Sequence, residues 1–149
     1  MADGFSAFLE RQKSILKTYG SVGKLPPEGW EPHMFFVRCK DDTLHRFTHG
    51  GFQISWENGS HPLFVLSTHE NFKHDCCPCS SKHFDHNASA YIQKGCRLHQ
   101  GLEEIRNHTF ILDRLRFSVP LGTEFSTWFS GMGCWGVVPD HCIKEVTDR

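Results

Sequence analysis

The segment from His61 to Lys82 constrains the fold of this chain more than any other. It reads HPLFVLSTHENFKHDCCPCSSK, with a short apolar run at Leu63–Leu66 and a second compact run at Asp75–Ser81. Short apolar runs bounded by turn residues are typical of buried strands. The segment therefore predicts two strands joined by a polar loop, with hydroxyl and basic side chains gathered where the second strand ends.

The composition favours one folded domain with a net charge close to zero. The chain has 149 residues, of which 38% are hydrophobic and 22% charged, and this is enough to bury a substantial core. Its formal net charge is -1, so nucleic-acid binding would have to come from a local basic patch. No run approaches the roughly 20 apolar residues of a membrane span, so no membrane association is expected.

The N-terminus lacks the basic start and apolar block of a secretion signal, and we therefore expect a cytoplasmic location. The cytoplasm is reducing. The seven cysteines are accordingly expected to be thiols or metal ligands rather than a disulfide framework.

Helices are expected mainly at the two ends of the chain. The spacing of apolar residues predicts an amphipathic helix over residues 4–19. A connector rich in Gly and Pro follows over residues 21–32. Pro139 is suited to the first turn of a helix, which predicts a short terminal helix over Asp140–Val146.

Further strands are expected on both sides of the central segment, at residues 33–39, 43–47, 52–57, 88–98 and 109–117. Asn58-Gly59 predicts a tight hairpin turn just before His61, and residues 131–136 predict a loose glycine-rich loop. Many short strands with helices at the ends indicate an α+β fold that is mostly β, a small and strongly bent barrel. Residues 1–32 would be a helix and connector, and residues 33–149 a single barrel domain.

The order of six segments resembles the PemK/MazF toxin family. The segments are FQISWENGS, HPLFVLS, PCSSK, ASAYIQKGCRL, FILDRLRF and GVVPDHCIKEV, which together cover roughly residues 50–146. In that family a strand reading Arg-Pro-Ala-x-Val-x-Ser is followed by one ending in Pro-x-Thr-Ser-Lys. A later segment reads x-Leu-Asp-x-Ile-Arg-Thr, and a C-terminal helix ends the domain.

This resemblance implies an SH3-like barrel that forms a homodimer and cleaves single-stranded RNA without a metal or other cofactor. It also implies a partner antitoxin that holds the enzyme inactive. Ser80 and Ser81 fall where the family has Thr and Ser, and would bind phosphate. Arg116 would offset the developing charge, and His61 would transfer protons. His61 departs from the family, which usually has Arg before the Pro.

A zinc site is the second interpretation. Ligand types for zinc span eighteen residues: His69, His74, Cys76, Cys77, Cys79, His83 and His86. With Glu70 and Asp75 nearby, the site would be structural or would belong to a metal-dependent hydrolase. The spacing is not that of paired Cys-x-x-Cys motifs, however. Small thiols that fill a buried strand explain the cysteines equally well.

A non-catalytic barrel that binds protein or nucleic acid is the third interpretation. The sequence offers cations and large rings for a phosphate-binding and stacking groove. These candidates are Arg38, Arg46, Arg97 and Arg114, with Trp56, Tyr91 and Trp135. The sequence does not show whether these side chains converge.

Overall fold

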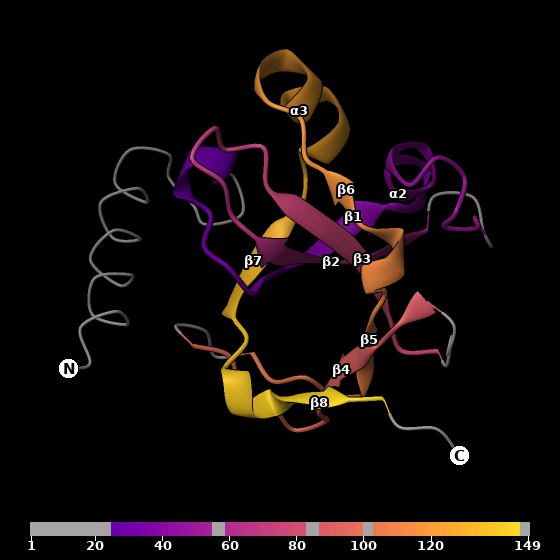
Figure 1. The fold of residues 1–149 in the computed structure, drawn as a ribbon, viewed down its shortest axis with the longest axis vertical. Helices are drawn as coiled ribbons and strands as arrows, with labels where there is room; N and C mark the ends of the chain where they lie inside the picture. Colours follow the sequence, from indigo (N-terminus) through magenta and orange to yellow (C-terminus); the bar gives the residue numbers. More distant parts are fainter. Residues whose placement is uncertain (1–24, 55–58, 83–86, 100–102, 147–149) are drawn as a thin grey trace.

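A computed structural model gives the fold of the chain and describes residues 25–54, 59–82, 87–99 and 103–146 (Figure 1). Within these residues the fold is α+β and mostly β. Eight strands form one antiparallel sheet that curls into a half-barrel, in the order β7-β1-β2-β3-β5-β4-β8, with β6 also paired to β3. The strands are β1 (Met34–Lys40), β2 (Ser60–Ser67), β3 (Asp75–Ser80), β4 (Ala90–Ile92), β5 (Thr109–Ile111), β6 (Phe117–Ser118), β7 (Gly133–Val137) and β8 (Ile143–Glu145).

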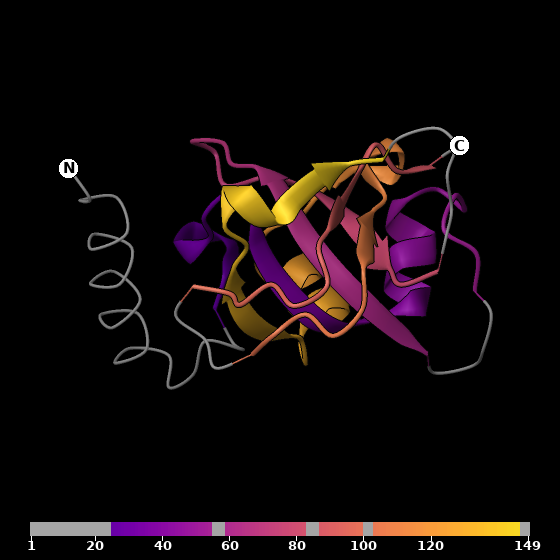
Figure 2. The same ribbon diagram turned by 90° about the horizontal axis from the view of Figure 1, so that it is seen from below.

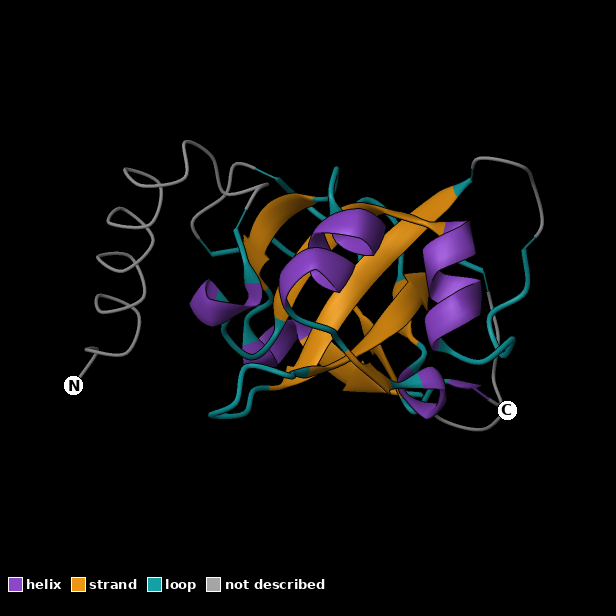
Figure 3. Cartoon of the chain, turned by 90° about the horizontal axis from the view of Figure 1, so that it is seen from above, coloured by secondary structure: helices purple, strands orange, loops and turns teal. Residues whose placement is uncertain are grey.

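The helical elements of the described residues are short. There are two α-helices, α2 (Asp41–Phe47) and α3 (Gly122–Phe129), and three 3-10 turns, η2 (Pro27–Gly29), η4 (Asp113–Leu115) and η5 (Asp140–Cys142). Both α-helices lie on one face of the sheet (Figure 3), and the view from the opposite side shows β8 in front (Figure 2). No helix in this described part of the chain is long and apolar enough to cross a bilayer.

The β2–β3 hairpin is the centre of the sheet, and its two predicted strands are confirmed. Leu63 pairs with Pro78, Phe64 with Cys77 and Val65 with Cys76. Successive side chains of a strand point to opposite faces of the sheet. The hairpin therefore contributes to two separate hydrophobic clusters.

The outer cluster lies on the face covered by the α-helices, and the inner cluster fills the concave side. From the hairpin, Leu63, Val65 and Cys76 join the outer cluster, whereas Phe64, Cys77 and Cys79 join the inner one. The outer cluster also holds Leu25, Trp30, Met34, Phe36, Leu44, Leu112 and Phe129. The inner cluster also holds Phe35, Ile92, Leu98, Ile105, Ile111, Val138 and Cys142.

A disulfide joins Cys96 to Cys142, so the expectation that all seven cysteines are thiols or metal ligands is wrong for this pair. The backbone brings the two residues together: Gln93 N donates to Cys142 O at 2.8 Å, and β4 pairs with β8. The Cα atoms are then 5.9 Å apart, within the range that a disulfide spans. The other five cysteines are free.

Residues 43–47 form part of α2, and their prediction as a strand is wrong. Asp41 and Asp42 occupy the first turn and His45 and Arg46 the last, which is the charge order that favours a helix. Leu44, in the middle of the helix, is fully buried in the outer cluster. The turn expected at residues 40–42 is instead the start of this helix, whose buried face packs in the outer cluster.

Other predicted elements also differ from the structure, and of the strand predicted at residues 88–98 only β4, Ala90–Ile92, is a strand. Residues 109–117 are not one strand, because η4 separates β5 from β6. Residues 133–137 form β7 rather than a loop, and residues 140–145 form η5 and β8 rather than a helix. Residues 52–54 are not in a strand, and the rest of that predicted strand lies outside the described residues, as do Asn58 and the predicted helix over 4–19.

Candidate functional site

The predicted residues His61 and Ser81 lie at the same end of the β2–β3 hairpin but on opposite faces. His61 is on the outer face, where its ring packs edge-on against Phe52 with ring centroids 5.0 Å apart. Ser81 lines a pocket on the inner face together with Pro62. The alternation of side chains along a strand causes this separation, so these two residues do not form one site.

Ser80 ends β3 near the start of β2, where the pairing of Leu63 with Pro78 points toward His61, but no contact among the described residues joins Ser80 or Arg116 to the His61 ring. Ser80 is buried, and its hydroxyl oxygen accepts a hydrogen bond of 3.1 Å from Lys82 N, as expected for a turn after a strand. Arg116 lies just before β6, and its Nε donates to Asp113 O at 3.2 Å. The hydrogen bonds of Ser80 and Arg116 thus go to their own neighbours in the chain, and none joins the four predicted residues to one another.

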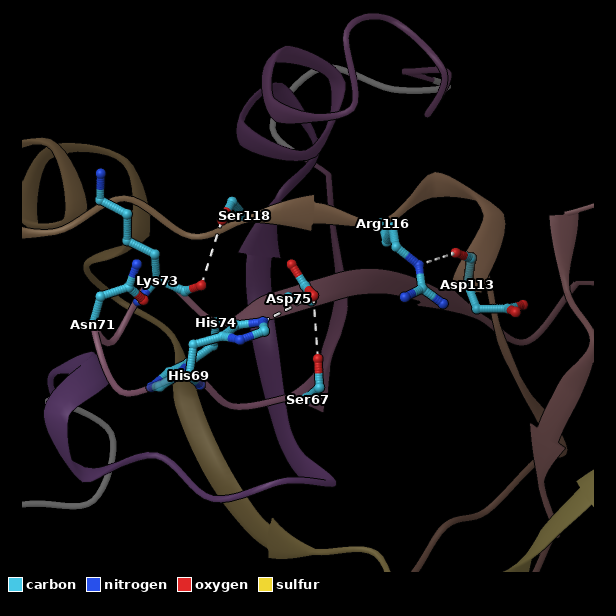
Figure 4. Close-up of polar contacts among 9 residues, drawn as sticks. All are labelled: Ser67, His69, Asn71, Lys73, His74, Asp75, Asp113, Arg116 and Ser118. Carbon is cyan, nitrogen blue, oxygen red and sulfur yellow. Dashed lines mark hydrogen bonds and ion pairs between the residues drawn. The ribbon is translucent and has the colours of Figure 1, made fainter.

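A polar cluster forms instead at the other end of the hairpin (Figure 4). Ser67 ends β2 and Asp75 begins β3, and His69 follows β2 in the connecting loop. His69 Nε2 lies 3.0 Å from Asp75 Oδ2, and the hydroxyl of Ser67 donates to the same oxygen at 3.2 Å. One carboxylate oxygen therefore receives two side-chain donors.

These contacts keep Asp75 charged. The hydrogen bond from His69 lowers the pKa of the Asp75 carboxyl below its usual value; the Ser67 hydrogen bond and the charges of His69 and Arg116 add to this, while burial opposes it. Because Nε2 of His69 faces the carboxylate, Nδ1 is the ring nitrogen available for proton transfer. A carboxylate that contacts an imidazole in this way fixes the orientation of the ring.

The His69–Asp75 pair lies in a shallow pocket of about 570 Å³ that is largely open to solvent and lined by polar side chains. Its lining combines one ammonium group with two carboxylates, an imidazole, an amide and a hydroxyl. The residues are His69, Glu70, Asn71, Lys73, Asp75 and Ser118. The groups needed for acid–base chemistry on a charged substrate are therefore present on one surface.

Buried His74 fixes the loop that carries this pocket. Its Nδ1 accepts a hydrogen bond of 3.0 Å from the backbone N of His69, and its Nε2 lies 2.8 Å from Pro27 O. These partners require the neutral tautomer with hydrogen on Nε2. In the same loop, Asn71 Oδ1 accepts from the backbone N of Lys73 at 3.1 Å.

A second pocket of about 490 Å³ lies on the other side of β6 and shares Ser118 with the first. Its lining includes the cations Arg46 and Arg116 and the carboxylate of Glu124, with His49 and Phe47. The Arg46 guanidinium lies 4.5 Å from the centre of the Trp128 ring, which holds this cation in place. We refer to the two pockets together as the β6 surface.

A second histidine–carboxylate pair involves the predicted residue His61. Its Nδ1 lies 2.7 Å from Asp41 Oδ1, and the Asp41 side chain is 2% exposed. Asp41 Oδ2 has no hydrogen-bond partner among the described residues. No further cation is recorded at this pair, so its main contribution is to compensate a buried carboxylate.

The cysteines proposed as zinc ligands are packed in the two hydrophobic clusters. Burial raises the pKa of Cys76, Cys77 and Cys79, which favours the thiol over the thiolate that zinc binds. Cys76 faces the cluster opposite to that of the other two. In the part of the chain described, no three His, Cys, Asp or Glu side chains form a metal-binding group, and His83 and His86 lie outside it.

The described residues thus form a curled β-sheet protein in which the His69–Asp75 pair lies in a pocket lined by polar side chains. No protein-family model matches the chain, and the comparisons with curated proteins and solved structures gave no match.

Sequence reasoning treated His69, Glu70 and Asp75 only as possible metal ligands. The available signal was the hairpin itself, because Ser67 and Asp75 flank its loop and must lie close together once the strands pair.

Proposed function

We propose that this chain is an endoribonuclease that cleaves single-stranded RNA on the β6 surface without requiring a metal. One observation carries the proposal: His69, held by Asp75, lines the same pocket as Glu70 and Lys73. Metal-free RNA cleavage requires a base for the 2′-hydroxyl, an acid for the leaving oxygen and a cation for the phosphoryl charge. These three residue types supply one group for each requirement.

In the proposed reaction Glu70 takes the proton of the 2′-hydroxyl. The 2′-oxygen then forms a bond to the adjacent phosphorus, and the bond from phosphorus to the 5′-oxygen breaks. The imidazolium of His69 gives its Nδ1 proton to that departing oxygen, while Asp75 stabilises the charged ring. The products are a 2′,3′-cyclic phosphate and a free 5′-hydroxyl.

Binding of the RNA backbone is assigned to the cations of the β6 surface. Lys73 is exposed in the first pocket, and Arg46 and Arg116 line the second. Arginine presents a planar fork of donors that suits phosphate oxygens. The two linings together also hold three carboxylates, so the excess of positive charge lies in the second pocket, where two Arg accompany the single carboxylate of Glu124.

The proposal keeps the activity implied by the resemblance to PemK/MazF toxins but assigns most of its steps to different residues. A half-barrel is compatible with an SH3-like barrel, and we keep a homodimer and an antitoxin partner as expectations. The Cys96–Cys142 disulfide argues against the reducing cytoplasmic location expected from the sequence. Arg116 keeps its role in offsetting charge. Proton transfer moves from His61 to His69 and Glu70, and phosphate binding moves from Ser80 and Ser81 to the cations of the β6 surface.

The test is incubation of purified protein with end-labelled single-stranded RNA in the presence of a chelator. We expect cleavage to cyclic-phosphate ends, reduced about 100-fold or more in His69→Ala and in Glu70→Gln. His141→Ala is the matched control, because this exposed histidine lies outside the β6 surface. Absence of cleavage, or equal rates in the wild type and His69→Ala, would reject the nuclease.

A non-catalytic RNA-binding module is the second candidate. The presence of Arg46 and Arg116 on one side of Ser118 and Lys73 on the other favours it, since phosphate binding needs no acid–base pair. In this case the RNA would bind without being cut. Binding would weaken with added salt and in Arg116→Gln, and His69→Ala would have little effect on it.

A further inference from the structure

A third pocket lies on the inner face of the sheet, at the opposite end of the β2–β3 hairpin from His69. It has a volume of about 190 Å³ and is lined mainly by apolar side chains, including Phe35, Val37 and Trp135. Its polar groups are Ser81, Arg106, Asn107 and Thr109. The pocket is thus an apolar cavity with a few polar groups, the usual composition of a small-molecule site.

The aromatic wall of this pocket is suited to a flat ring. The Phe35 ring is buried, and it lies with its centroid 6.1 Å from that of the half-buried Trp135 ring. Indole faces stack well on nucleobases, whatever the base. The volume is below that of sites that enclose a whole drug-sized ligand, and it is appropriate for one ring system with the remainder of the ligand outside.

The polar groups at this pocket indicate what the ring would carry. Arg106 is exposed, with no hydrogen bond or ion pair recorded for its side chain, and it is the only charged residue lining the pocket in the described chain. It favours an anionic group such as phosphate. Asn107, also exposed, offers an amide that pairs well with the edge of adenine. Thr109 contributes less, because its hydroxyl already donates to Asn107 O at 3.0 Å.

The backbone holds these groups in place. Ile105, just before Arg106, donates from its N to Cys96 O at 2.8 Å. His99, three residues after Cys96, donates from its N to Val137 O at 2.9 Å, and Val137 is the last residue of β7. The segment that carries Arg106 and Asn107 is therefore fixed opposite the strand that carries Trp135. Binding does not have to order it first, which lowers the entropic cost of binding.

We propose that this pocket binds an adenine nucleotide, with the base stacked on Trp135, its edge at the Asn107 amide and its phosphate at Arg106. The pocket is separate from the β6 surface, because Pro62 and Ser81 lie where β2 begins and β3 ends, whereas Ser67 and Asp75 lie at the other end of the same strands. The same chemistry occurs in a free mononucleotide and in one nucleotide of an RNA strand.

Calorimetric titration with adenosine 5′-monophosphate tests the proposal. We expect saturable binding, weaker for adenosine, which lacks the phosphate. Arg106→Gln should weaken binding of the monophosphate about tenfold and leave adenosine unchanged. Trp135→Ala should weaken both ligands about tenfold or more, and Trp135→Phe should weaken them less because a ring remains. Arg97→Gln, an exposed change outside the lining of this pocket, is the matched control.

Each result of the titration either supports the nucleotide site or rejects it. No binding of the monophosphate, or binding that is unaffected by Arg106→Gln and Trp135→Phe, would overturn the site even if Trp135→Ala fails to fold. If a short oligoadenylate displaces the monophosphate, the natural ligand is part of an RNA strand; if it does not, the ligand is a free nucleotide. The titration involves no RNA cleavage, so this proposal and the nuclease can fail independently.

Discussion

His61 and Asp41 are joined by a contact of 2.7 Å between Nδ1 and Oδ1, which connects the start of β2 to the start of α2. Asp41 is almost fully buried, and its second oxygen has no partner among the described residues. A buried carboxylate that loses its partner is costly. His61 therefore stabilises the fold through Asp41, which is a different role from the proton transfer first predicted for it.

His61→Ala should lower the free energy of unfolding by about 1–3 kcal/mol, because it leaves Asp41 without its side-chain partner. Urea denaturation measures this change. The double variant His61→Ala/Asp41→Asn should recover part of the loss, since the buried group is then neutral. RNA cleavage should persist in His61→Ala. A variant of normal stability that no longer cleaves RNA would return the catalytic role to His61.

Asp75 should make stability depend on pH in the acid range. Its pKa is lowered in the folded protein, chiefly by the His69 hydrogen bond, whereas an unfolded Asp titrates near pH 3.9, an approximate reference value. Its stabilisation is therefore present above the unfolded pKa and is lost as the pH falls through the lower folded pKa. Asp75→Asn should be less stable than the wild type at pH 7, and the difference should shrink below about pH 4.

Denaturant unfolding at a series of pH values measures this difference. Ser67→Ala removes one of the two donors to Asp75 and should have an intermediate effect. A stability difference between wild type and Asp75→Asn that stays constant with pH would contradict the assignment.

The five free cysteines should react very slowly with thiol reagents in the folded protein. Burial raises the pKa of Cys39, Cys76, Cys77 and Cys79, and raises that of Cys134 to about 12, so little thiolate is present at neutral pH. A colorimetric thiol assay should detect five groups per chain in guanidinium and few without it. Rapid reaction of the native protein would show that the strand carrying Cys76–Cys79 opens readily.

The disulfide should contribute measurably to stability. Cys96 and Cys142 are 46 residues apart, and closing a loop of this length corresponds to about 4 kcal/mol of lost chain entropy in the unfolded state. We expect Cys142→Ser, or the wild type in a reducing buffer, to unfold at lower denaturant concentration by about 2–4 kcal/mol of stability. Equal unfolding curves with and without reductant would indicate that the bond does not form in solution.

The central hairpin could be predicted from the sequence because its apolar runs are short and bounded by turn residues. The strand β7 could not, because Gly133 and Gly136 suggest a loop. The structure shows what these glycines permit: the Arg38 guanidinium packs against Gly133, and the backbone of His99 approaches Gly136, whose φ is +130°. A local sequence pattern does not show that segments distant in the chain approach each other this closely.

The candidate site was missed for a related reason. Ser67, His69 and Asp75 are polar residues in and beside a loop, and no spacing rule marks them. Their convergence depends on the register of β2 with β3 and on buried His74, which fixes the backbone of His69. The predicted residues Ser80 and Ser81 are adjacent in sequence, and the pleat of the strand places one in the core and the other in an inner-face pocket.

Ser118 is the residue common to both pockets of the β6 surface. Because its side chain is small, it would obstruct the proposed RNA little between the first pocket and the second. A single nucleotide would occupy only one of the two hollows. The shortest effective substrate is then expected to contain at least two phosphates, and a bulky side chain at position 118 would divide the path while leaving both halves intact.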